Sequence, residues 1–505
     1  MRYGFVIDQD RCIGCHACTV ACKEEHQVPV GVFRTWVKYV EKGEFPYTSR
    51  HFGVMRCNHC DDSPCTTICP TRALFRRHDG IVDFDNRRCI GCKACMQACP
   101  YDALYIDPNH NTAAKCNFCA HRVEVSLEPA CVIVCPTQAI LAGDLDAPGS
   151  KVARTVATGK VSVRKPQKGT QPKLFYVGIE GDVIEPTRLS RQNTYFWSDR
   201  RDGGPASADR LDAAGAFARE VYDVPHPAPW GWKIAAYLWT KSIAAGVLLV
   251  AAILMALSGQ TNSTLFNIVC PSLAVIGLAA TTFLLVFDLK RRDRFFYLIT
   301  KPNFRSWLVI GTYILIGYGA IGFAWLLAGV YSGSVPALVR WLAAALAAGS
   351  ACYSAFLFAQ AKGRDLWQSP LFLWHLLLQA MLAGSATLVI AGVLTGAAQI
   401  VRSAALVLLV SLFVCLGMIV GEITLPHASE DLRISIGTMT RGRLRLRFWG
   451  LAIGLGLMTP IFLTAWTFTS DVPAYVPLSA AVVALCGLWW FEALWVEAGQ
   501  SAPLS

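Results

Sequence analysis

Charged residues are scarce in the second half of this 505-residue chain. From residue 231 onward, 275 residues carry 17 Lys and Arg and 9 Asp and Glu, whereas the first 230 residues carry 29 and 26. Such different compositions exclude a single homogeneous soluble domain and a disordered chain. The late positive charge is confined to loops between apolar runs, which is typical of a membrane protein. We therefore expect contact with membrane lipid and no nucleic-acid partner.

The beginning of the chain lacks the marks of an export signal. Residues 1–8 contain no apolar stretch and no twin arginine. Sixteen of the 20 Cys lie between Cys12 and Cys135. Because cytosolic thiols stay reduced, we expect metal-bound thiolates rather than a disulfide framework. The later cysteines are expected to pack as apolar side chains; they are Cys270, Cys352, Cys415 and Cys486.

Eight apolar stretches after Trp230 are each long enough to cross a bilayer of about 30 Å. They lie near residues 234–257, 264–287, 306–330, 336–360, 369–395, 401–425, 447–469 and 475–496. Each must be helical, because lipid cannot satisfy free backbone N–H and C=O groups. Residues 231–505 are thus expected to form an all-α bundle of eight transmembrane helices.

Loop charge sets the expected orientation of these spans. The loops after spans two, four and six carry thirteen Lys and Arg, whereas the opposite loops carry Arg340 and Arg402. The positive-inside rule places the richer side in the cytoplasm. An even number of spans puts both termini there. We therefore expect a multi-pass protein of the bacterial inner membrane whose cysteine-rich domain faces the cytoplasm.

The sixteen early cysteines form four groups of four, here called tetrads. In chain order the tetrads are Cys12, Cys15, Cys18 and Cys22; Cys57, Cys60, Cys65 and Cys69; Cys89, Cys92, Cys95 and Cys99; and Cys116, Cys119, Cys131 and Cys135. The run C-x₂-C-x₂-C-x₃-C-P is the signature of bacterial [4Fe–4S] ferredoxins. A single CxxC would leave zinc open, but four complete tetrads argue against it. Sixteen thiolates at four per cluster predict four [4Fe–4S] clusters.

This set of spacings resembles the four-cluster ferredoxin subunit of dimethyl-sulfoxide-reductase-type molybdoenzymes, over about residues 1–180. The resemblance implies an α+β ferredoxin-like domain in which the first tetrad crosses with the fourth and the second with the third. Such crossing follows the two-cluster rule, by which the fourth Cys of a run ligates the neighbouring cluster. The implied ligand sets are Cys12, Cys15 and Cys18 with Cys135; Cys22 with Cys116, Cys119 and Cys131; Cys57, Cys60 and Cys65 with Cys99; and Cys69 with Cys89, Cys92 and Cys95.

Residues 181–230 are expected to connect this domain to the membrane half. The basic, turn-prone segment 160–173 is either a solvated strap or a docking surface for a partner subunit. Histidines among the tetrads are expected at the surface or beside the ligands rather than as ligands; they are His16, His26, His59, His78 and His121.

Histidine is nearly absent from the membrane half, where only His375 and His427 occur. A membrane b-type haem needs axial histidines on facing helices, and His427 falls in a loop, so no haem is expected. The chain also lacks a strand-linked GxGxxG, a P-loop and a nucleophile elbow. A lipid-soluble quinone, menaquinone or ubiquinone, is left as the redox partner.

The second half resembles the polysulfide-reductase-type (NrfD-like) membrane anchors, which are haem-free and have eight helices. The resemblance rests on DLKRRDRF from Asp288, on KPNFRSW from Lys301 and on YLWTKSIAAG from Tyr237, with YSAFLF from Tyr353 as a looser match. The family pattern is nearer DLxRPxRF, so Arg292 stands where proline is expected. Together the two resemblances imply a fusion of two subunits that are often separate.

Ionisable groups inside a bilayer are usually functional. Lys241 lies about two turns into the first span, with Tyr237 on the same helix face. We expect Tyr237, Lys241 and Tyr353 to donate hydrogen bonds to a quinone, and Asp288 and Glu422 to relay its protons. The alternative for Lys241 is that its side chain reaches back to the membrane interface.

Two further ionisable residues in the spans are interpreted more simply. For His375 a packing role is as plausible as a functional one, and Glu492 is expected at the membrane interface. Both lie within apolar spans, at residues 369–395 and 475–496.

The sequence thus predicts an electron-transfer and quinone-interacting membrane subunit of a respiratory complex. Electrons would pass between the quinone pool and a separate, molybdopterin-containing catalytic subunit, which performs the primary substrate chemistry. The alternative is a module of a larger proton-translocating complex, which intramembrane Lys241, His375 and Glu422 permit. A His375 variant that loses proton translocation but keeps quinone turnover would favour this alternative.

Overall fold

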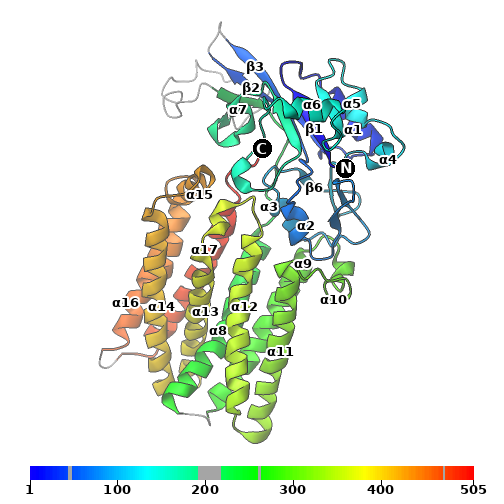
Figure 1. The fold of residues 1–505 in the computed structure, drawn as a ribbon. Helices are drawn as coiled ribbons and strands as arrows, with labels where there is room; N and C mark the ends of the chain where they lie inside the picture. The colour runs from blue at the N-terminus through cyan, green and yellow to red at the C-terminus, as the bar shows by residue number, and fades with distance from the viewer. Residues whose placement is uncertain (44–47, 192–217, 260–262, 470–471) are drawn as a thin grey trace. The chain divides into compact units, whose positions relative to one another are not determined.

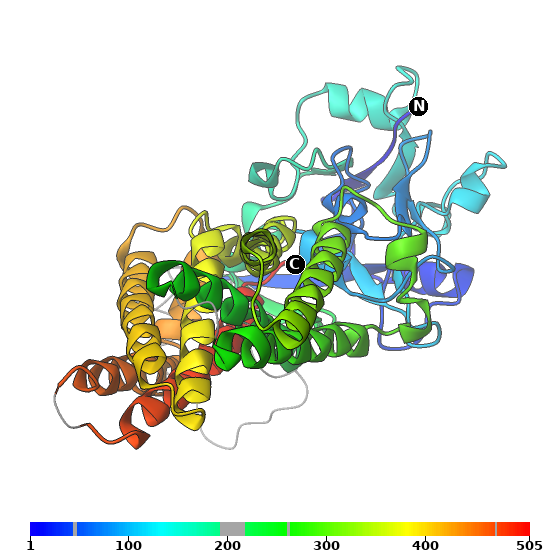
Figure 2. The ribbon, with the colours of Figure 1, turned by 90° about the horizontal axis from the view of Figure 1, so that it is seen from below.

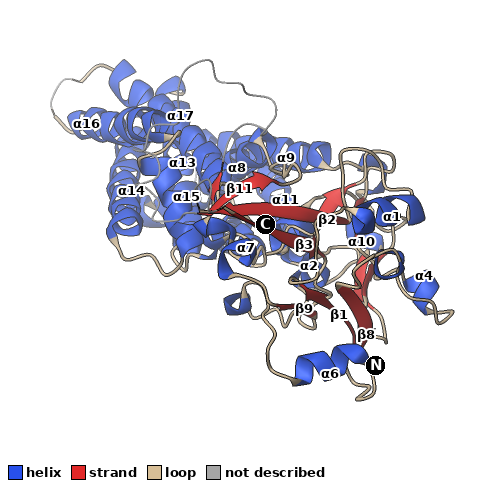
Figure 3. Ribbon diagram, turned by 90° about the horizontal axis from the view of Figure 1, so that it is seen from above, coloured by secondary structure: helices blue, strands red, loops and turns tan. Residues whose placement is uncertain are grey.

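The computed structural model describes residues 1–43, 48–191, 218–259, 263–469 and 472–505, without the side chains of 190 and 191. The chain divides into two compact units. The first holds residues 1–229, 361–363 and 503–505, and the second holds residues 230–360 and 364–502. Every strand of the described residues belongs to the first unit, whereas the long helices belong to the second (Figure 3). The predicted order, an α+β domain followed by apolar helices, is confirmed.

Two sheets form the frame of the first unit. In one, β1 (Tyr3–Asp8) lies between β8 (Ile140–Asp144), which is antiparallel to it, and β9 (Leu174–Val177), which is parallel. The other has the order β10-β11-β2-β3. Its strands are β2 (Thr35–Lys42), β3 (Ser49–Arg56), β10 (Ser190–Arg191) and β11 (Ala218–Tyr222). Because β3 ends at Arg56, it delivers the second tetrad directly from the sheet.

Short helices and hairpins alternate with the cysteines. The helices of this unit are α1 (Ala17–Glu25), α2 (Pro64–Ile68), α3 (Ala94–Ala98), α4 (Ala120–Val123), α5 (Ala130–Ile133), α6 (Lys151–Ala157) and α7 (Gly181–Ile184). The antiparallel hairpins pair β4 (Leu74–Arg76) with β5 (Val82–Phe84) and β6 (Leu104–Ile106) with β7 (Ala113–Lys115). Helix α1 packs against α5, and α2 packs against α3. The first tetrad therefore meets the fourth, and the second meets the third.

The connector differs from its expected form. Its residues 192–217 lie outside the described residues, but β11 pairs with β2 and is built into a sheet. In the basic segment 160–173, Arg164 and Lys173 are buried, and the Nζ of Lys173 lies 3.0 Å from Asp61 Oδ1. These two cations are internal, so neither a solvated strap nor a docking surface describes them. The turn-forming residues of this region predicted loops. They did not predict that β11 pairs with β2 and so becomes part of the sheet.

Eight helices of the described residues are long and apolar enough to cross a membrane, as predicted. The spans are α8 (Trp232–Ser258); a π-helix (Leu265–Val269) continued by α9 (Cys270–Asp288); α11 (Trp307–Ser332); α12 (Ala337–Ala359); α13 (Phe372–Leu394); α14 (Ala398–Thr424); a π-helix (Arg447–Met458) continued by α16 (Thr459–Trp466); and α17 (Tyr475–Gly499). Shorter helices occupy two loops, α10 (Tyr297–Thr300) and α15 (Glu430–Thr440). The spans run side by side in Figures 1 and 2.

Both π-helical segments precede a proline. Pro271 and Pro460 each follow the last π-helical residue by two positions. Proline lacks an N–H, and its ring clashes with the carbonyl four residues earlier, so the wider π turn relieves the helix there. Nearby, Trp325 Nε1 donates to the carbonyl of Phe266 at 3.0 Å. The span that contains Pro271 therefore has a freed backbone carbonyl partnered inside the bundle, as lipid requires.

Small residues let the central helices approach closely. Helices α8 and α13 are the most buried of the eight spans. A Cβ added to Gly246 of α8 would meet the carbonyl oxygen of Ala380 on α13, and one added to Gly384 would meet the backbone of Gly246. Without a hydrophobic force between helices in lipid, such backbone contact is a main source of association. Helix α8, which carries Tyr237 and Lys241, is thus fixed at the centre of the bundle.

Candidate metal centres and membrane pocket

All four tetrads share one backbone feature. In each, the residue just before the second cysteine has a left-handed φ. These residues are Gly14 (φ 68°), His59 (φ 44°), Gly91 (φ 68°) and Phe118 (φ 62°). The turn aims backbone N–H groups at sulfur, and Gly91 N lies 3.4 Å from Cys89 Sγ. The same left-handed turn therefore occurs once in each tetrad. Glycine occupies it in the first and third tetrads, and a larger residue occupies it in the second and fourth.

The two non-glycine members of this set are held in place by packing. A left-handed conformation costs such residues roughly 1 kcal/mol or more. The rings of His59 and Phe118 pack edge to face at 5.3 Å, and Phe118 stacks on Phe5 at 4.0 Å. The Nδ1 of His59 also accepts the N–H of Val82 at 3.2 Å. Strain kept at these positions by surrounding contacts is typical of a functional site.

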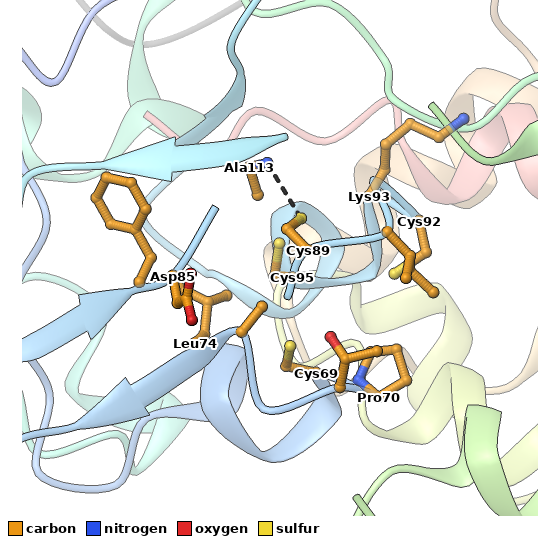
Figure 4. A pocket seen from close by; sticks show the side chains of 13 residues that line it. Cys69, Pro70, Leu74, Asp85, Cys89, Cys92, Lys93, Cys95 and Ala113 are labelled. Atoms are coloured by element: carbon orange, nitrogen blue, oxygen red, sulfur yellow. Dashed lines mark hydrogen bonds between the residues drawn. The ribbon is translucent and has the colours of Figure 1, made fainter. Parts of the chain in front are cut away.

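One cavity shows a complete predicted ligand set. Cys69, Cys89, Cys92 and Cys95 line it together with Pro70, and Figure 4 shows their side chains around one space. The N–H of Ala113 donates to Cys89 Sγ at 3.3 Å. Four thiols around a common space, with backbone donors on the sulfur, fit a [4Fe–4S] cluster.

Interactions between thiolates group the other cysteines. Cys12 interacts with Cys15 and Cys135; Cys22 with Cys116, Cys119 and Cys131; Cys65 with Cys57, Cys60 and Cys99. These interactions agree with the four ligand sets that the resemblance implies, which remain a prediction. We call them set A (Cys12, Cys15, Cys18, Cys135), set B (Cys22, Cys116, Cys119, Cys131), set C (Cys57, Cys60, Cys65, Cys99) and set D (Cys69, Cys89, Cys92, Cys95).

A few interactions cross from one set to the next. Cys18 of set A interacts with Cys131 of set B. Cys116 of set B interacts with Cys57 of set C. Cys95 of set D interacts with Cys65 of set C. The sets therefore follow one another in the order A, B, C, D.

Burial makes these cysteines poor thiolates on their own. It raises the pKa of Cys18 to about 11 and the pKa of Cys92 to about 12, and it raises the pKa of Cys95 well above its ordinary value. The thiolate is the form that binds metal, so the positive charge of iron must keep these sulfurs ionised. Without a metal, these buried positions disfavour negatively charged sulfur. They therefore fit a cluster whose core is cationic.

Two basic side chains of this unit contact cysteine sulfur, and a third does not. Nη1 of Arg56 lies 3.1 Å from Cys131 Sγ, and Nε2 of His26 lies 3.2 Å from Cys119 Sγ. His121 instead lies 2.7 Å from Glu25 Oε1. His26 therefore lies beside a ligand rather than replacing one. Arg56 was not singled out in the sequence, because one arginine before a cysteine forms no pattern.

In the membrane unit, the predicted quinone donors of α8 and α12 lie together. Lys241 Nζ donates to the carbonyl of Ala351 at 2.9 Å and to Ser354 Oγ at 2.7 Å, and Tyr237 Oη lies 2.6 Å from the same hydroxyl. Lys241 Nζ also lies 5.1 Å from the ring centre of Tyr353. Lys241 is 1% exposed, so its side chain is enclosed by the bundle. These residues form a buried polar cluster, here called the lysine pocket.

The lysine pocket includes two residues that were given no part in the quinone site from the sequence. Ser354, between Lys241 and Tyr237, stands in the quoted YSAFLF run but was given no role. Glu492 of α17 is buried and interacts electrostatically with Lys241. Its expected interfacial position stays a prediction, because burial inside the bundle does not give its depth in the membrane. Helical spacing alone does not reveal which face of α17 turns inward.

Glu422, one of the two predicted proton relays, contacts other residues. Glu422 Oε2 lies 3.1 Å from His375 Nε2, and Glu422 Oε1 accepts from Ser369 Oγ at 2.9 Å. Asp288 is the last residue of α9 and is half-buried. His375 and Gln379 line a small cavity with Phe491. His375 thus has an acidic partner as well as packing contacts, so neither of its two expected roles is excluded.

The chain matches three family models. Residues 3–24 match a 4Fe-4S binding domain, and residues 49–145 match a 4Fe-4S dicluster domain. Residues 220–503, more than half of the chain, match the family described as Polysulphide reductase, NrfD. The first two matches cover cysteines of all four tetrads, and the third covers all eight spans.

Several curated proteins are similar to part of the chain. A tetrathionate reductase subunit of Salmonella typhimurium is 44% identical over 202 residues, which are 39% of this chain and 80% of that protein. A polysulfide reductase chain of Wolinella succinogenes is 41% identical over 187 residues, 36% of this chain and 98% of that protein. Protein NrfC of Escherichia coli is 43% identical over 189 residues, 37% of this chain and 85% of that protein. Little more than a third of this chain thus spans most of each relative.

Proposed function

This protein belongs to the polysulphide reductase NrfD family, as an iron–sulfur dicluster subunit followed by an NrfD membrane domain, and on that premise we propose that it carries electrons between membrane quinone and a separate catalytic subunit. Four [4Fe–4S] clusters would form the path. The observation that carries the proposal is the succession of four cysteine sets, A to D, in the same chain as a buried polar pocket among membrane spans. Iron–sulfur clusters transfer electrons one at a time. A quinone takes up two such electrons, together with two protons, and becomes a quinol.

The proposed cluster ligands are the sixteen cysteines of sets A to D. Support comes from the shared cavity of set D and from the thiolate interactions within the other sets. The contacts between neighbouring sets support transfer along the row rather than four isolated centres. Reduction potentials along such a row are set by charge, by hydrogen bonds to sulfur and by solvent exposure.

The proposed quinone site is the lysine pocket. A quinone needs hydrogen-bond donors for its carbonyl oxygens and an acceptor for protons when the quinol is oxidised. Lys241 and Tyr237 supply donors, and Tyr353 supplies an aromatic face. Glu492 is our proton acceptor beside them, because its Oε1 is buried without a hydrogen-bond partner in the described residues. A buried carboxylate inside a membrane is costly and so is usually functional.

Asp288 and Glu422 keep a proposed role further along the proton route. Glu422 would exchange protons through His375 rather than directly with the quinone, since its contacts are to His375 and Ser369. Asp288, at the end of α9, would connect the route with water. No haem takes part in this scheme.

The proposed partner is a molybdopterin-containing catalytic subunit. The similar proteins named as tetrathionate and polysulfide reductase subunits are parts of larger reductases by their names, and this chain shows no substrate-converting motif of its own. From loop charge we propose that the iron–sulfur unit faces the cytoplasm of a bacterial cell. Purifying the chain anoxically from its source membrane should bring down one large subunit with bound molybdopterin, and a different partner would contradict the assignment.

A quinone-binding experiment tests the lysine pocket. Detergent-solubilised wild-type chain should retain quinone or bind a quinone analogue, and Tyr237→Phe and Lys241→Met should weaken binding about tenfold or more, because each removes a buried donor. Lys233→Met is the matched control, since Lys233 is on the same helix but its Nζ lies over the ring of Phe287. Equal binding by Lys241→Met and the control would contradict this site.

The second candidate function is proton translocation. It is favoured by the His375–Glu422 pair and by the buried Oε1 of Gln379, which has no hydrogen-bond partner in the described structure. Polar groups of this kind inside a membrane often mark proton routes. In proteoliposomes, His375→Gln should abolish proton uptake while quinone turnover persists if this function holds. Loss of both together would place His375 in quinone turnover itself and would contradict proton translocation as a separate function.

A further inference from the structure

The buried guanidinium of Arg56 is a charge without a carboxylate partner. Arg56 is 0% exposed at the end of β3. It forms no salt bridge among the described residues, and its Nε and Nη2 have no hydrogen-bond partner there. Burying an ion without an opposite charge costs several kcal/mol in proteins. The fold must therefore gain something from keeping this cation inside.

Other buried cations of the same unit are compensated differently. Lys173 Nζ lies 3.0 Å from Asp61 Oδ1 and donates to the carbonyl of Gly80 at 2.6 Å. Lys115 Nζ donates to the carbonyls of Val82 and Cys116. Their donors are directed at oxygen atoms of the protein. Arg56 differs because its one hydrogen-bond acceptor among the described residues is a cysteine sulfur.

The surroundings of Arg56 are sulfur and an aromatic ring. Nη1 donates to Cys131 Sγ at 3.1 Å, and the guanidinium carbon lies 4.6 Å from the ring centre of Phe5. Arg56 also interacts electrostatically with Cys131, Cys116 and Cys18. Two of these cysteines belong to set B and the third to set A. Arg56 therefore lies where sets A and B meet.

We propose that Arg56 is the internal counter-charge of the row, which raises the reduction potential of the set B cluster and, more weakly, that of the set A cluster. This inference rests on the proposed function. A [4Fe–4S] cluster held by four thiolates is anionic, and each reduction adds one electron and one further negative charge. A fixed cation donating to a ligand sulfur stabilises the reduced form more than the oxidised form. The guanidinium stays protonated throughout, so no proton moves with the electron.

The position of Arg56 makes the effect local. Its hydrogen bond reaches set B directly, whereas set A is reached only through the electric field at Cys18. A higher potential at one member of a row lets it hold an electron between its neighbours. Arg56 is thus a positioning and tuning residue for electron transfer, and it touches no substrate.

The test is an anoxic redox titration of the full chain, followed by the paramagnetic signals of the reduced clusters. In Arg56→Met, one transition should move to a lower potential by at least a tenfold change in its oxidised-to-reduced ratio, about 59 mV for a one-electron couple. It should be the transition that Cys119→Ser also disturbs, because both alter set B. Arg56→Lys keeps the charge and should shift the same transition less.

Arg164→Met is the matched control. Arg164 is also 0% exposed, but its Nη2 donates to a backbone carbonyl at 2.9 Å, and its guanidinium carbon lies 5.8 Å from the Tyr101 ring centre. Its loss should shift the set B transition less than Arg56→Met does. An unchanged titration in Arg56→Met, or an equal shift in Arg164→Met, would overturn the proposal.

If Arg56→Met loads its clusters poorly, Arg56→Lys still tests the proposal. If Arg56→Met holds less iron than wild type, Arg56→Lys decides: full iron with a set B potential within about 59 mV of wild type supports the counter-charge, because the charge is kept, and a larger fall overturns it. Loss of iron from both variants would also overturn it, because the charge would then not be what matters. Fewer than four transitions in the wild type would contradict the four-cluster function, while the Arg56 comparison could still be made on those present.

Discussion

The two units of the chain bury positive charge beside different partners. In the iron–sulfur unit, Lys173 faces a carboxylate and Arg56 a cysteine sulfur, so each cation meets an anion that belongs to a structural or metal-binding role. In the membrane unit, Lys241 faces a carbonyl and a hydroxyl, with the carboxylate of Glu492 also acting on it. The first arrangement fixes charge for permanent cofactors. The second leaves donors able to exchange partners, which suits a carrier that enters and leaves.

The largest expected difference between the units is in their cysteines. Cys95→Ser should remove a ligand of set D and abolish electron transfer through the row. Counted from the ligands, the iron content should fall from about 16 to about 12 atoms per molecule. Cys415→Ser is the control, since Cys415 is equally buried but lies in α14. Iron analysis and spectra of the reduced protein check both. Full iron in Cys95→Ser would break the proposed ligand sets.

The second largest effect should distinguish the buried lysine of the membrane unit from the buried cations of the iron–sulfur unit. Lys241→Met should slow quinol oxidation by about 100-fold, the usual loss when one preorganised buried donor is removed from a reacting group. Its clusters should load and titrate as in wild type, because the change is confined to the membrane unit. Stopped-flow kinetics with a soluble quinol analogue measure the rate. Wild-type turnover would show that the lysine pocket is structural.

A smaller effect concerns the packing that holds the lysine pocket. Gly246→Ala should destabilise the membrane unit by about 2 kcal/mol, because the new Cβ meets the carbonyl oxygen of Ala380. Gly417→Ala, in α14, is the matched control, since an added Cβ there has nothing within 4 Å. Thermal unfolding in detergent should show a lower midpoint for Gly246→Ala only. Equal midpoints would mean that α8 can move away from α13 without loss.

The smallest effect is a pH dependence confined to the iron–sulfur unit. Burial lowers the pKa of His226, but its contacts with Asp102 Oδ2 at 2.5 Å and Asp223 Oδ2 at 3.3 Å outweigh burial and raise the pKa to about 9. A folded-state pKa above the unfolded value of about 6.5 gives stability that is complete below that pH and is lost as the pH rises through about 9. The thermal midpoint of this unit, followed by cluster absorbance, should therefore fall between about pH 6 and about pH 9.5.

In His226→Gln that fall should be absent, and the difference from wild type should vanish near the upper end of this range. The exposed His78 provides the control, since His78→Gln should keep the wild-type profile. An identical slope in wild type and His226→Gln would show that other groups cause the dependence.

How much could be predicted differs between the units for a physical reason. The iron–sulfur motifs are contiguous in sequence, so their spacing reveals the tetrads, and a repeated turn such as that at Gly14 and Gly91 gives them one geometry. The eight spans were predicted because lipid allows only helices of that length. Tyr237 and Lys241 were predicted to share a face, since they are one turn apart on the same helix.

The rest depends on contacts between distant elements. Ser354 and Glu492 join Lys241 only because α12 and α17 turn those faces toward α8. Glu422 was expected to act beside the quinone donors, yet helix packing pairs it with His375. Arg56 is buried because β3 pairs with β2 and its end meets Phe5 of β1. None of these relations has a period or spacing in the sequence, so pattern analysis does not detect them.

The most direct test of the central claim is electron exchange between quinone and the cluster row. The oxidised chain, fully loaded with iron and free of any partner, is mixed anoxically with a quinol analogue. We predict that the paramagnetic signals of reduced clusters appear, with two electrons delivered per quinol consumed, and that Lys241→Met slows this step. A row that dithionite reduces but that never exchanges electrons with quinol or quinone would contradict the account.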